Sequence, residues 1–256
     1  MIWLKRLLLL TVLVLDIGLS QNDASAIESQ ATVAKTFAVF SVAYNRQGEA
    51  VRGGVCGSAF FISTTRAITA YHVLQNANFQ APEGFEKVRL WLVHEGEPAI
   101  ELQTGFLTYR PDHDVTEIQL PEERAVNSRY VFAYSKRPLA AAANVETDGI
   151  VANTAGPRLA RTATGDIEVV AVPNLIRLRM AGQILRRAQV RLSAADVRLS
   201  DAPEFELSYR PVVGLSGGPV VSGGEVFAMN SFADPAGAPH TWALDLHAAS
   251  LLRRNN

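Results

Sequence analysis

Short apolar runs, each ended by glycine, proline or another turn residue, recur along the chain from residue 36 onward. Helical spacing is scarce among them, and β-branched and aromatic residues are common. The first set comprises Phe37–Tyr44, Ser58–Ile62, Ala67–Ala70, Val88–Val93, Phe106–Tyr109 and Val115–Leu120. The second comprises Ile150–Asn153, Ile167–Val172, Leu175–Met180, Ala188–Leu192 and the hairpin Pro219–Phe232, turning at Ser222–Gly224. Many short strands with this punctuation predict an all-β barrel or sandwich.

The two sets of runs are of similar size, which predicts two β-barrels packed side by side. We place the first barrel at about 30–134, a linker at about 135–144, and the second barrel at about 145–254. Within the last segment, Trp242–Arg254 has apolar residues loosely on one side and two arginines near its end. Cations suit the carboxyl end of a helix dipole, so we expect a C-terminal α-helix there.

The N-terminus has the order of a secretory signal. Lys5 and Arg6 precede the apolar run Leu7–Leu15, and a polar stretch then ends in the small residues Ala24–Ala26. We predict a signal peptide at 1–26, and therefore export to the periplasm or the cell exterior. The apolar run is far shorter than the roughly 20 residues that cross a bilayer, so no stable membrane insertion is expected after cleavage. An uncleaved membrane anchor is the alternative.

Composition restricts the partners and the chemistry. The chain has 24 Lys and Arg against 25 Asp and Glu, a formal charge of −1 that gives no reason to expect nucleic acid. Cys56 is the only cysteine, so an internal disulfide is impossible and stability must come from packing. A zinc site of the cysteine type is likewise excluded, and we expect no metal. Abundant Arg and Ala without disulfides are typical of a bacterial protein.

The most specific string is Gly214–Val221, in which Ser216 stands among glycines directly before an apolar strand. Glycine allows positive φ and the close approach of a substrate backbone. A nucleophilic serine needs N–H groups that converge on the carbonyl oxygen, and Gly214 and Ser216 are placed to supply them. Taken alone, the string is also compatible with an ordinary turn.

A second string, Thr69–His72, ends a strand and opens a helical turn with a histidine. Serine is a poor nucleophile until an imidazole takes its proton, and that imidazole needs a carboxylate on its other nitrogen. Asp112 and Asp114 are the two candidates. Asp114 directly precedes an apolar strand and should be the more buried, so we favour it as the partner of His72.

These strings resemble the motifs of the chymotrypsin-like serine proteases. The resemblance is greatest to the bacterial branch with the HtrA/DegP-type and glutamyl endopeptidase-type domains, here without a PDZ domain. Thr69–His72 matches a Thr-Ala-x-His block, Asp114 opens an apolar strand, and Gly214–Pro219 matches Gly-x-Ser-Gly-Gly-Pro. The likeness spans about residues 37–249. It implies two packed six-stranded antiparallel β-barrels with His72, Asp114 and Ser216 in the cleft between them.

The resemblance further implies an endopeptidase that acts on polypeptides without a metal or an organic cofactor. In this family the strand after the nucleophile hairpin pairs with the substrate backbone, and Gly224–Phe232 is similar to that strand. Ser231, Phe232 and Ala233 would then flank the primary pocket. Arg210, six residues before Ser216, would lie near the pocket floor, where a cation favours an acidic substrate side chain.

The chain departs from the family pattern at four positions. Leu215 replaces the acidic residue that holds a newly cut N-terminus in many animal relatives, so activation by that salt bridge is not expected. Glu117 stands where an aliphatic residue is usual, and Tyr71 replaces a small residue. Cys56 resembles one half of a common family disulfide, without its partner.

Two other functions are compatible with parts of the sequence. A protease-like fold that no longer turns over could still bind extended peptides. An α/β-hydrolase esterase fits less well, because its nucleophile is followed by a helix and its histidine comes last in the chain. Here a proline and a strand follow Ser216, and only His240 and His247 lie beyond it. Neither substrate nor oligomeric state is specified by these motifs.

Overall fold

A computed structural model describes residues 35–79, 85–135, 139–163, 167–190, 193–194, 197–198, 202–233 and 240–251. All of them belong to one compact unit. The expected signal peptide at 1–26 lies outside the described residues. Within the described segments, no helix has the length and apolar character needed to cross a membrane.

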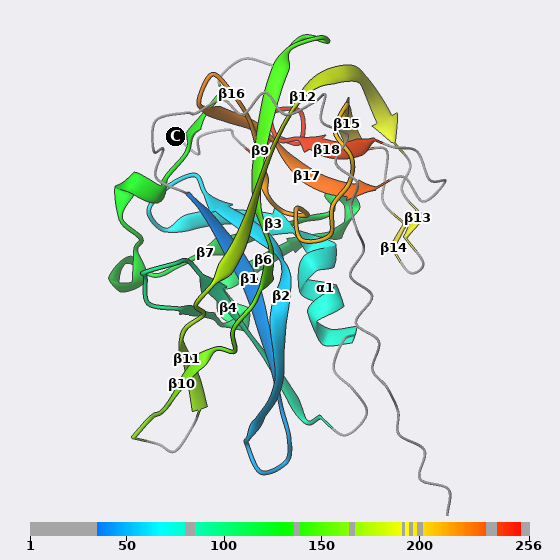
Figure 1. Ribbon diagram of the computed structural model, residues 1–256. Helices are drawn as coiled ribbons and strands as arrows, with labels where there is room; N and C mark the ends of the chain where they lie inside the picture. The colour runs from blue at the N-terminus through cyan, green and yellow to red at the C-terminus, as the bar shows by residue number, and fades with distance from the viewer. Residues whose placement is uncertain are drawn as a thin grey trace, which may run out of the picture. The chain divides into compact units, whose positions relative to one another are not determined.

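The first half of the chain forms a curled sheet of seven antiparallel strands in the order β5-β4-β1-β2-β3-β7-β6 (Figure 1). The strands are β1 Thr36–Tyr44, β2 Ala50–Phe61, β3 Arg66–Ala70, β4 Lys87–Val93, β5 Ile100–Leu102, β6 Leu107–Arg110 and β7 Val115–Gln119. No pairing between described residues joins β5 to β6. The first barrel is therefore an open half-barrel of seven strands, where a closed barrel of six was expected.

The second half forms a sheet in the order β16-β9-β12-β15-β18-β17-β8, which β16–β17 pairing closes into a barrel of six strands. The strands are β8 Ala133–Tyr134, β9 Asn144–Asn153, β12 Leu175–Val190, β15 Ala202–Leu207, β16 Pro219–Ser222, β17 Glu225–Ala233 and β18 Thr241–Asp245. The six barrel strands pair antiparallel, and β8 adds to β17 in parallel. The predicted double-barrel architecture is thus confirmed, with these two differences.

Smaller elements lie in the connections. They are the helix α1 Tyr71–Phe79, the ribbons β10 Arg158–Arg161 with β11 Ile167–Ala171 and β13 Ser193–Ala194 with β14 Val197–Arg198, and the 3-10 turns η1 Thr104–Phe106, η2 Pro111–His113, η3 Glu122–Arg124 and η4 Ser128–Tyr130. Two of them, α1 and η2, bear on the site described below.

The expected C-terminal helix is wrong for the part of Trp242–Arg254 that the structure describes. Residues 242–245 belong to β18, which pairs on both sides and is buried on both faces. A fully buried strand carries a continuous apolar run, and such a run is easily read as a helix. Asp245 then ends the strand, because its Oδ1 accepts from the N–H groups of His247 and Ala248 at 3.0 Å. Turns follow up to Leu251.

Two further strand predictions are corrected in the second half. Leu175–Met180 and Ala188–Leu192 were expected as separate strands, but β12 is continuous through Val190. Strand β15 was not predicted, because its acidic residues alternate with apolar ones only over a few positions and a proline stands near its start.

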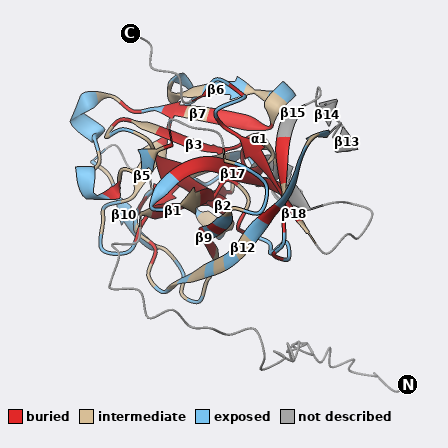
Figure 2. Ribbon diagram, turned by 90° about the horizontal axis from the view of Figure 1, so that it is seen from above, coloured by how far each residue is buried: buried red, intermediate tan, exposed pale blue. Residues whose placement is uncertain are grey.

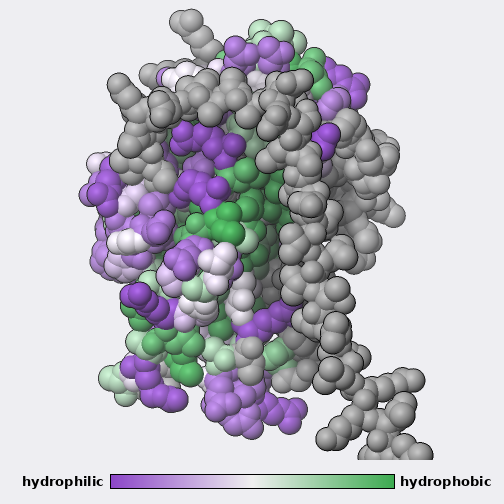
Figure 3. Space-filling model, viewed as in Figure 1, coloured by the Kyte–Doolittle hydropathy of each residue, from purple (hydrophilic) through white to green (hydrophobic). Residues whose placement is uncertain are grey.

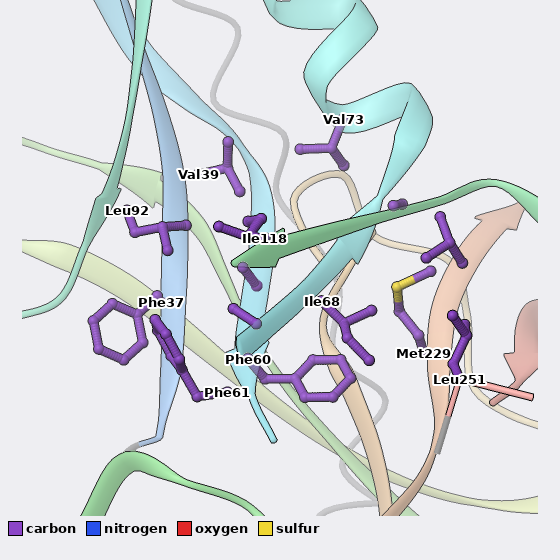
Figure 4. Packing of buried hydrophobic residues seen from close by; sticks show 14 of the residues in the cluster. Phe37, Val39, Phe60, Phe61, Ile68, Val73, Leu92, Ile118, Met229 and Leu251 are labelled. Carbon is purple, nitrogen blue, oxygen red and sulfur yellow. The ribbon is translucent and has the colours of Figure 1, made fainter. Parts of the chain in front are cut away.

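The two halves share one core. Phe60, Phe61 and Ile68 of the first sheet belong to the same buried cluster as Met229 and Leu251 of the second half (Figure 4). Burying one such side chain fully is worth about 1.5–3 kcal/mol. Figure 2 shows buried residues concentrated on β1, β2, β3, β7 and β17, with exposed residues on the outer connections. The shared core holds the ends of β3 and β7 against the β16–β17 hairpin.

Candidate active site

The first component of the site is Asp114, at the junction of η2 and β7. Its backbone lies in the left-handed region with φ 52°, a conformation that aspartate tolerates better than most residues. This geometry closes η2, since Asp114 N–H donates to the carbonyl of Pro111 at 3.2 Å. Asp114 is only 3% exposed. The expectation that it is more shielded than Asp112, which is exposed, is met.

His72 lies beside Asp114 because β3 and β7 pair in antiparallel register. Ala70 opposes Val115, so Tyr71 N–H donates to the Asp114 carbonyl at 3.0 Å. His72 then makes two contacts with the carboxylate: its backbone N–H donates to Oδ1 at 3.0 Å, and Nδ1 lies 2.8 Å from Oδ2. A ring nitrogen held by a carboxylate leaves Nε2 as the nitrogen available to a substrate or nucleophile.

Ser231 supplies a third contact to the same carboxylate. Its hydroxyl donates to Asp114 Oδ2 at 2.8 Å, and its side chain is fully buried. The pairing of β17 with β18 shifts register between Asn230 and Phe232, so Ser231 is the extra residue of a β-bulge. A bulge re-aims a side chain, and here it turns Ser231 toward Asp114. The side chain of Ser231 therefore contacts the carboxylate. Its expected place beside the primary pocket stays a prediction.

Ser216 lies on a loop that is held by its backbone. Its carbonyl accepts from Ser58 N–H of β2 at 2.8 Å, and Gly217 N–H donates to the Asn230 carbonyl at 2.8 Å. Gly217 has φ 79°, and a Cβ there would lie 2.2 Å from the Ser58 carbonyl oxygen and 2.9 Å from Ala70 N. Only glycine fits this contact, which holds the loop against β2 and the end of β3.

The same contacts bring the loop to the start of α1, where His72 lies. A Cβ added to Gly57 would lie 2.6 Å from a methyl group of Val73 and 2.9 Å from the carbonyl oxygen of Ser216. Val73 directly follows His72 in α1 (Figure 4 shows Val73 on the helix). Gly57 therefore lies against both Val73, the neighbour of His72, and the backbone of Ser216.

Not every N–H group of the Ser216 loop has a backbone acceptor. Gly214 adopts φ 96°, and a residue with a side chain does not fit there because its Cβ would lie 2.6 Å from Val151 Cα. Between Val212 and Gly218, the N–H groups of Leu215, Gly217 and Gly218 donate to backbone carbonyls. Among the described residues, those of Val213, Gly214 and Ser216 do not.

Ser58 joins the two halves of the site. Its hydroxyl donates to the Gly214 carbonyl at 2.8 Å and accepts from Ile150 N–H at 2.9 Å. Sequence reasoning missed this bridge, because a serine at the end of a strand run carries no signal of a partner 156 residues away.

The expected position of Arg210 at a pocket floor stays a prediction. Arg210 is exposed, whereas its neighbour Tyr209 is buried and donates its hydroxyl to Asn230 Oδ1 at 2.6 Å. Burial raises the pKa of Tyr209, which keeps its hydroxyl a donor. Asn230 Nδ2 in turn donates to Thr147 Oγ1 at 2.5 Å.

The remaining expectations are met only in part. The side chains of Phe232 and Ala233 lie outside the described residues. Leu215 is buried against Gly149, so an apolar contact replaces the acidic residue of animal relatives. Glu117 is half-buried and accepts from Arg66 Nε at 3.0 Å, which explains an acid in this strand. Cys56 is a free thiol whose Sγ lies 3.1 Å from Ser41 Oγ, and burial raises the pKa of this thiol.

Other candidate sites are weaker. A cavity of about 440 Å³ near Phe37, Trp91 and Tyr130 contains none of the residues above. In the described part of the chain, no three histidine, cysteine or acidic side chains gather in a way that could hold a metal ion. On the face seen in Figure 3, hydrophobic residues gather in the middle, with hydrophilic residues above and below.

Solved structures with the same fold are proteases. The active form of the Rv3671c protease from M. tuberculosis aligns over 86% of this chain and 79% of its own, with TM-score 0.53 and 18% identity. The HtrA-type protease AlgW with a tripeptide aligns over 87% and 60%, with TM-score 0.56 and 12% identity. The MamO protease domain from Magnetospirillum magneticum aligns over 88% and 99%, with TM-score 0.52 and 14% identity.

At these identities the likeness concerns the fold, and at that level the similarity to HtrA-type serine protease domains is confirmed. No protein-family model and no curated protein matches the chain.

Proposed function

We propose that this protein is a serine endopeptidase with His72, Asp114 and Ser216 as its catalytic residues. The observation that carries the proposal is the double contact of His72 with a buried Asp114, through Nδ1 at 2.8 Å and through the backbone N–H at 3.0 Å. Such a contact fixes the tautomer and orientation of an imidazole that acts as a general base. The neighbouring Ser216 loop supplies the nucleophile.

In the proposed reaction, Ser216 Oγ attacks the scissile carbonyl while His72 Nε2 takes the hydroxyl proton. The tetrahedral intermediate collapses when His72 gives this proton to the leaving amine, and water then hydrolyses the acyl-enzyme by the same steps. Asp114 orients His72 and stabilises the imidazolium, supported by the Ser231 hydroxyl.

The N–H groups of Gly214 and Ser216 would hold the oxyanion. Loss of one such donor costs about 2.7–4 kcal/mol of transition-state stabilisation in other hydrolases. The Ser58 hydroxyl supports this role, because its bond to the Gly214 carbonyl fixes the peptide unit that follows Gly214.

The substrate class we propose is an extended polypeptide. It would add to the edge of β17 near residues 231–233, where backbone pairing gives affinity with little sequence selection. We also propose export to the periplasm or exterior through residues 1–26, in a bacterial host. Cell fractionation of the full chain, beside a chain that begins at residue 27, tests export: the shortened chain should stay in the cytoplasm.

Hydrolysis of casein by the purified chain, beside Ser216→Ala, tests the activity. We expect release of peptides by the wild type and loss of at least about 10³-fold in the variant. A folded wild-type protein that binds peptides without cutting them would instead identify a catalytically silent binding module.

A further inference from the structure

The Ser216 loop, residues 214–218, lies between β2 of the first half and β9 of the second. On the β2 side, a Cβ added to Gly217 would lie 2.2 Å from the Ser58 carbonyl oxygen. On the β9 side, a Cβ added to Gly218 would lie 2.8 Å from the Asp148 carbonyl oxygen. Backbone touches backbone on both sides of the loop, so the position of each strand helps to fix the loop.

Strand β9 borders the loop at two further points. A Cβ added to Gly149 would lie 2.7 Å from Leu215 Cδ2 and 3.2 Å from Leu215 Cα. A Cβ added to Gly214 would lie 2.8 Å from the Ile150 carbonyl oxygen. These contacts follow the loop backwards along β9, with no space left between strand and loop. A shift of β9 would therefore move the loop with it.

The side chain of Asp148 connects β9 to the first residue of β1 and to β12. Thr36 Oγ1 donates to Asp148 Oδ2 at 3.0 Å, and Nη1 of Arg177 in β12 donates to the same oxygen at 2.5 Å. Arg177 Nη2 also donates to the Thr36 carbonyl at 3.0 Å. These three residues join three strands from both halves of the molecule, where β9 and β12 extend across β1 (Figure 1).

The network of Thr36, Asp148 and Arg177 is shielded from water, unlike an ordinary surface ion pair. Thr36 and Asp148 are buried, and the Arg177 side chain is only 24% exposed. Water screens surface ion pairs, whereas a shielded pair with several hydrogen bonds is stronger. Loss of Arg177 would leave the Asp148 carboxylate shielded and without this cation, which is costly. Strand β9 should then shift until water reaches the carboxylate.

We propose that Asp148 and Arg177 are positioning residues, which hold β9 against the loop and so keep the N–H groups of Gly214 and Ser216 in place for the oxyanion. The proposal rests on the proposed endopeptidase function. Asp148 reaches the loop through its backbone, and Arg177 acts through Asp148. The ion pair is internal to the chain, whereas the acid that many animal relatives carry in place of Leu215 pairs with a newly cut N-terminus.

Arg177→Met is the variant that tests this role. Methionine fills similar space but makes neither hydrogen bond, so β9 loses its connection to β1 through Arg177. In the wild type, the N–H groups of Leu215, Gly217 and Gly218 donate to backbone carbonyls. These amides should exchange with solvent about tenfold faster in the variant, because the loop opens locally without global unfolding.

Two further variants give the comparison. Arg186→Met makes the same substitution on the same strand, but Arg186 pairs with Glu206 of β15 and its side chain is 66% exposed. None of the contacts given above for the Ser216 loop involves either residue. Arg177→Lys is the conservative variant: it keeps a cation beside Asp148 but lacks the planar fork that holds two acceptors. It should recover part of the lost labelling rate.

The test combines two measurements on the wild type and these three variants. One is the rate of fluorophosphonate labelling over a range of probe concentrations, and the other is hydrogen exchange of peptides that cover residues 212–218. For Arg177→Met we expect the maximal labelling rate to fall about tenfold with an unchanged half-saturating concentration, because an oxyanion donor acts in the transition state. Arg186→Met should match the wild type in both measurements.

A purely structural ion pair would lower the stability of Arg177→Met but leave its labelling and loop exchange at wild-type values, and this result overturns the proposal. Equal losses in Arg177→Met and Arg186→Met overturn it as well. If the wild type does not label at all, the proposed endopeptidase function fails, and hydrogen exchange alone decides whether Arg177 holds the loop. Should Arg177→Met fail to fold, the double variant with Asp148→Asn replaces it, because it leaves no shielded charge without a partner.

Discussion

The two halves of the site are held in place by different means. On the first sheet, His72 and Asp114 are positioned by side-chain hydrogen bonds, with three donors on one buried carboxylate. On the second, Ser216 is positioned by backbone contacts and by glycines that have no room for a Cβ. The first half depends on the chemistry of one acid, and the second depends on the absence of side chains. The two kinds of support should therefore fail differently when they are altered.

The largest effect is expected from Asp114→Asn. The asparagine oxygen can still accept the backbone N–H of His72, but its amide nitrogen would donate to Nδ1 and so hold the ring in the wrong tautomer. A neutral amide also does not stabilise the imidazolium, so the labelling rate should fall by about 10⁴-fold. The fold should remain, as measured by circular dichroism and urea unfolding. Asp112→Asn is the control, since Asp112 is exposed and pairs with His113 at 2.8 Å. If Asp112→Asn proved to be the more damaging variant, the assignment of the carboxylate would be wrong.

Gly217→Ala should lower the unfolding free energy and removes no reactive side chain. Its Cβ would overlap the Ser58 carbonyl oxygen at 2.2 Å in a left-handed backbone, which we expect to cost about 3 kcal/mol or more. Gly224→Ala is the matched control: φ is 83° there, but nothing lies within 4 Å of an added Cβ. In this control only the left-handed backbone is unfavourable for alanine, which should lower the unfolding free energy by about 1 kcal/mol. Urea unfolding distinguishes the two, and equal losses would show that the contact with β2 does not hold the loop.

The smallest effect is expected from Ser58→Ala, which removes the bridge between the halves. The Ile150 N–H and the Gly214 carbonyl both lose a partner, at a cost of about 1–3 kcal/mol in unfolding free energy. The labelling rate should also fall, because the Gly214 peptide is less well fixed. Ser222→Ala, whose exposed hydroxyl bonds Asn144 O, should change neither quantity. A loss of stability without a loss of labelling would separate Ser58 from the oxyanion site.

The sequence predicted the local parts of this site better than the connections between them. The strings around His72, Asp114 and Ser216 are recognisable because each combines a reactive side chain with a turn or strand signal. The contacts of Ser58 and Ser231 were not predictable, because they join residues 156 and 117 positions apart. The Ser231 contact further depends on a bulge, and a single extra residue in a ladder leaves no clear trace in an alternation pattern.

The errors in the fold have a similar cause. Residues 242–245 form a strand buried on both faces, which has no alternation to distinguish it from a helix. Arg210 was placed at a pocket floor by its distance from Ser216 alone, and this placement stays a prediction for an exposed side chain. Counting residues along a loop does not determine which side chain points inward.

Mass spectrometry of the fluorophosphonate adduct tests the central claim most directly. The purified protein is labelled at neutral pH, digested, and the modified residue is located by fragmentation. We predict one stoichiometric adduct on Ser216, absent from Ser216→Ala and formed far more slowly in Asp114→Asn. A folded protein that forms no adduct, or that carries it on another residue, would contradict the assignment of Ser216 as the nucleophile.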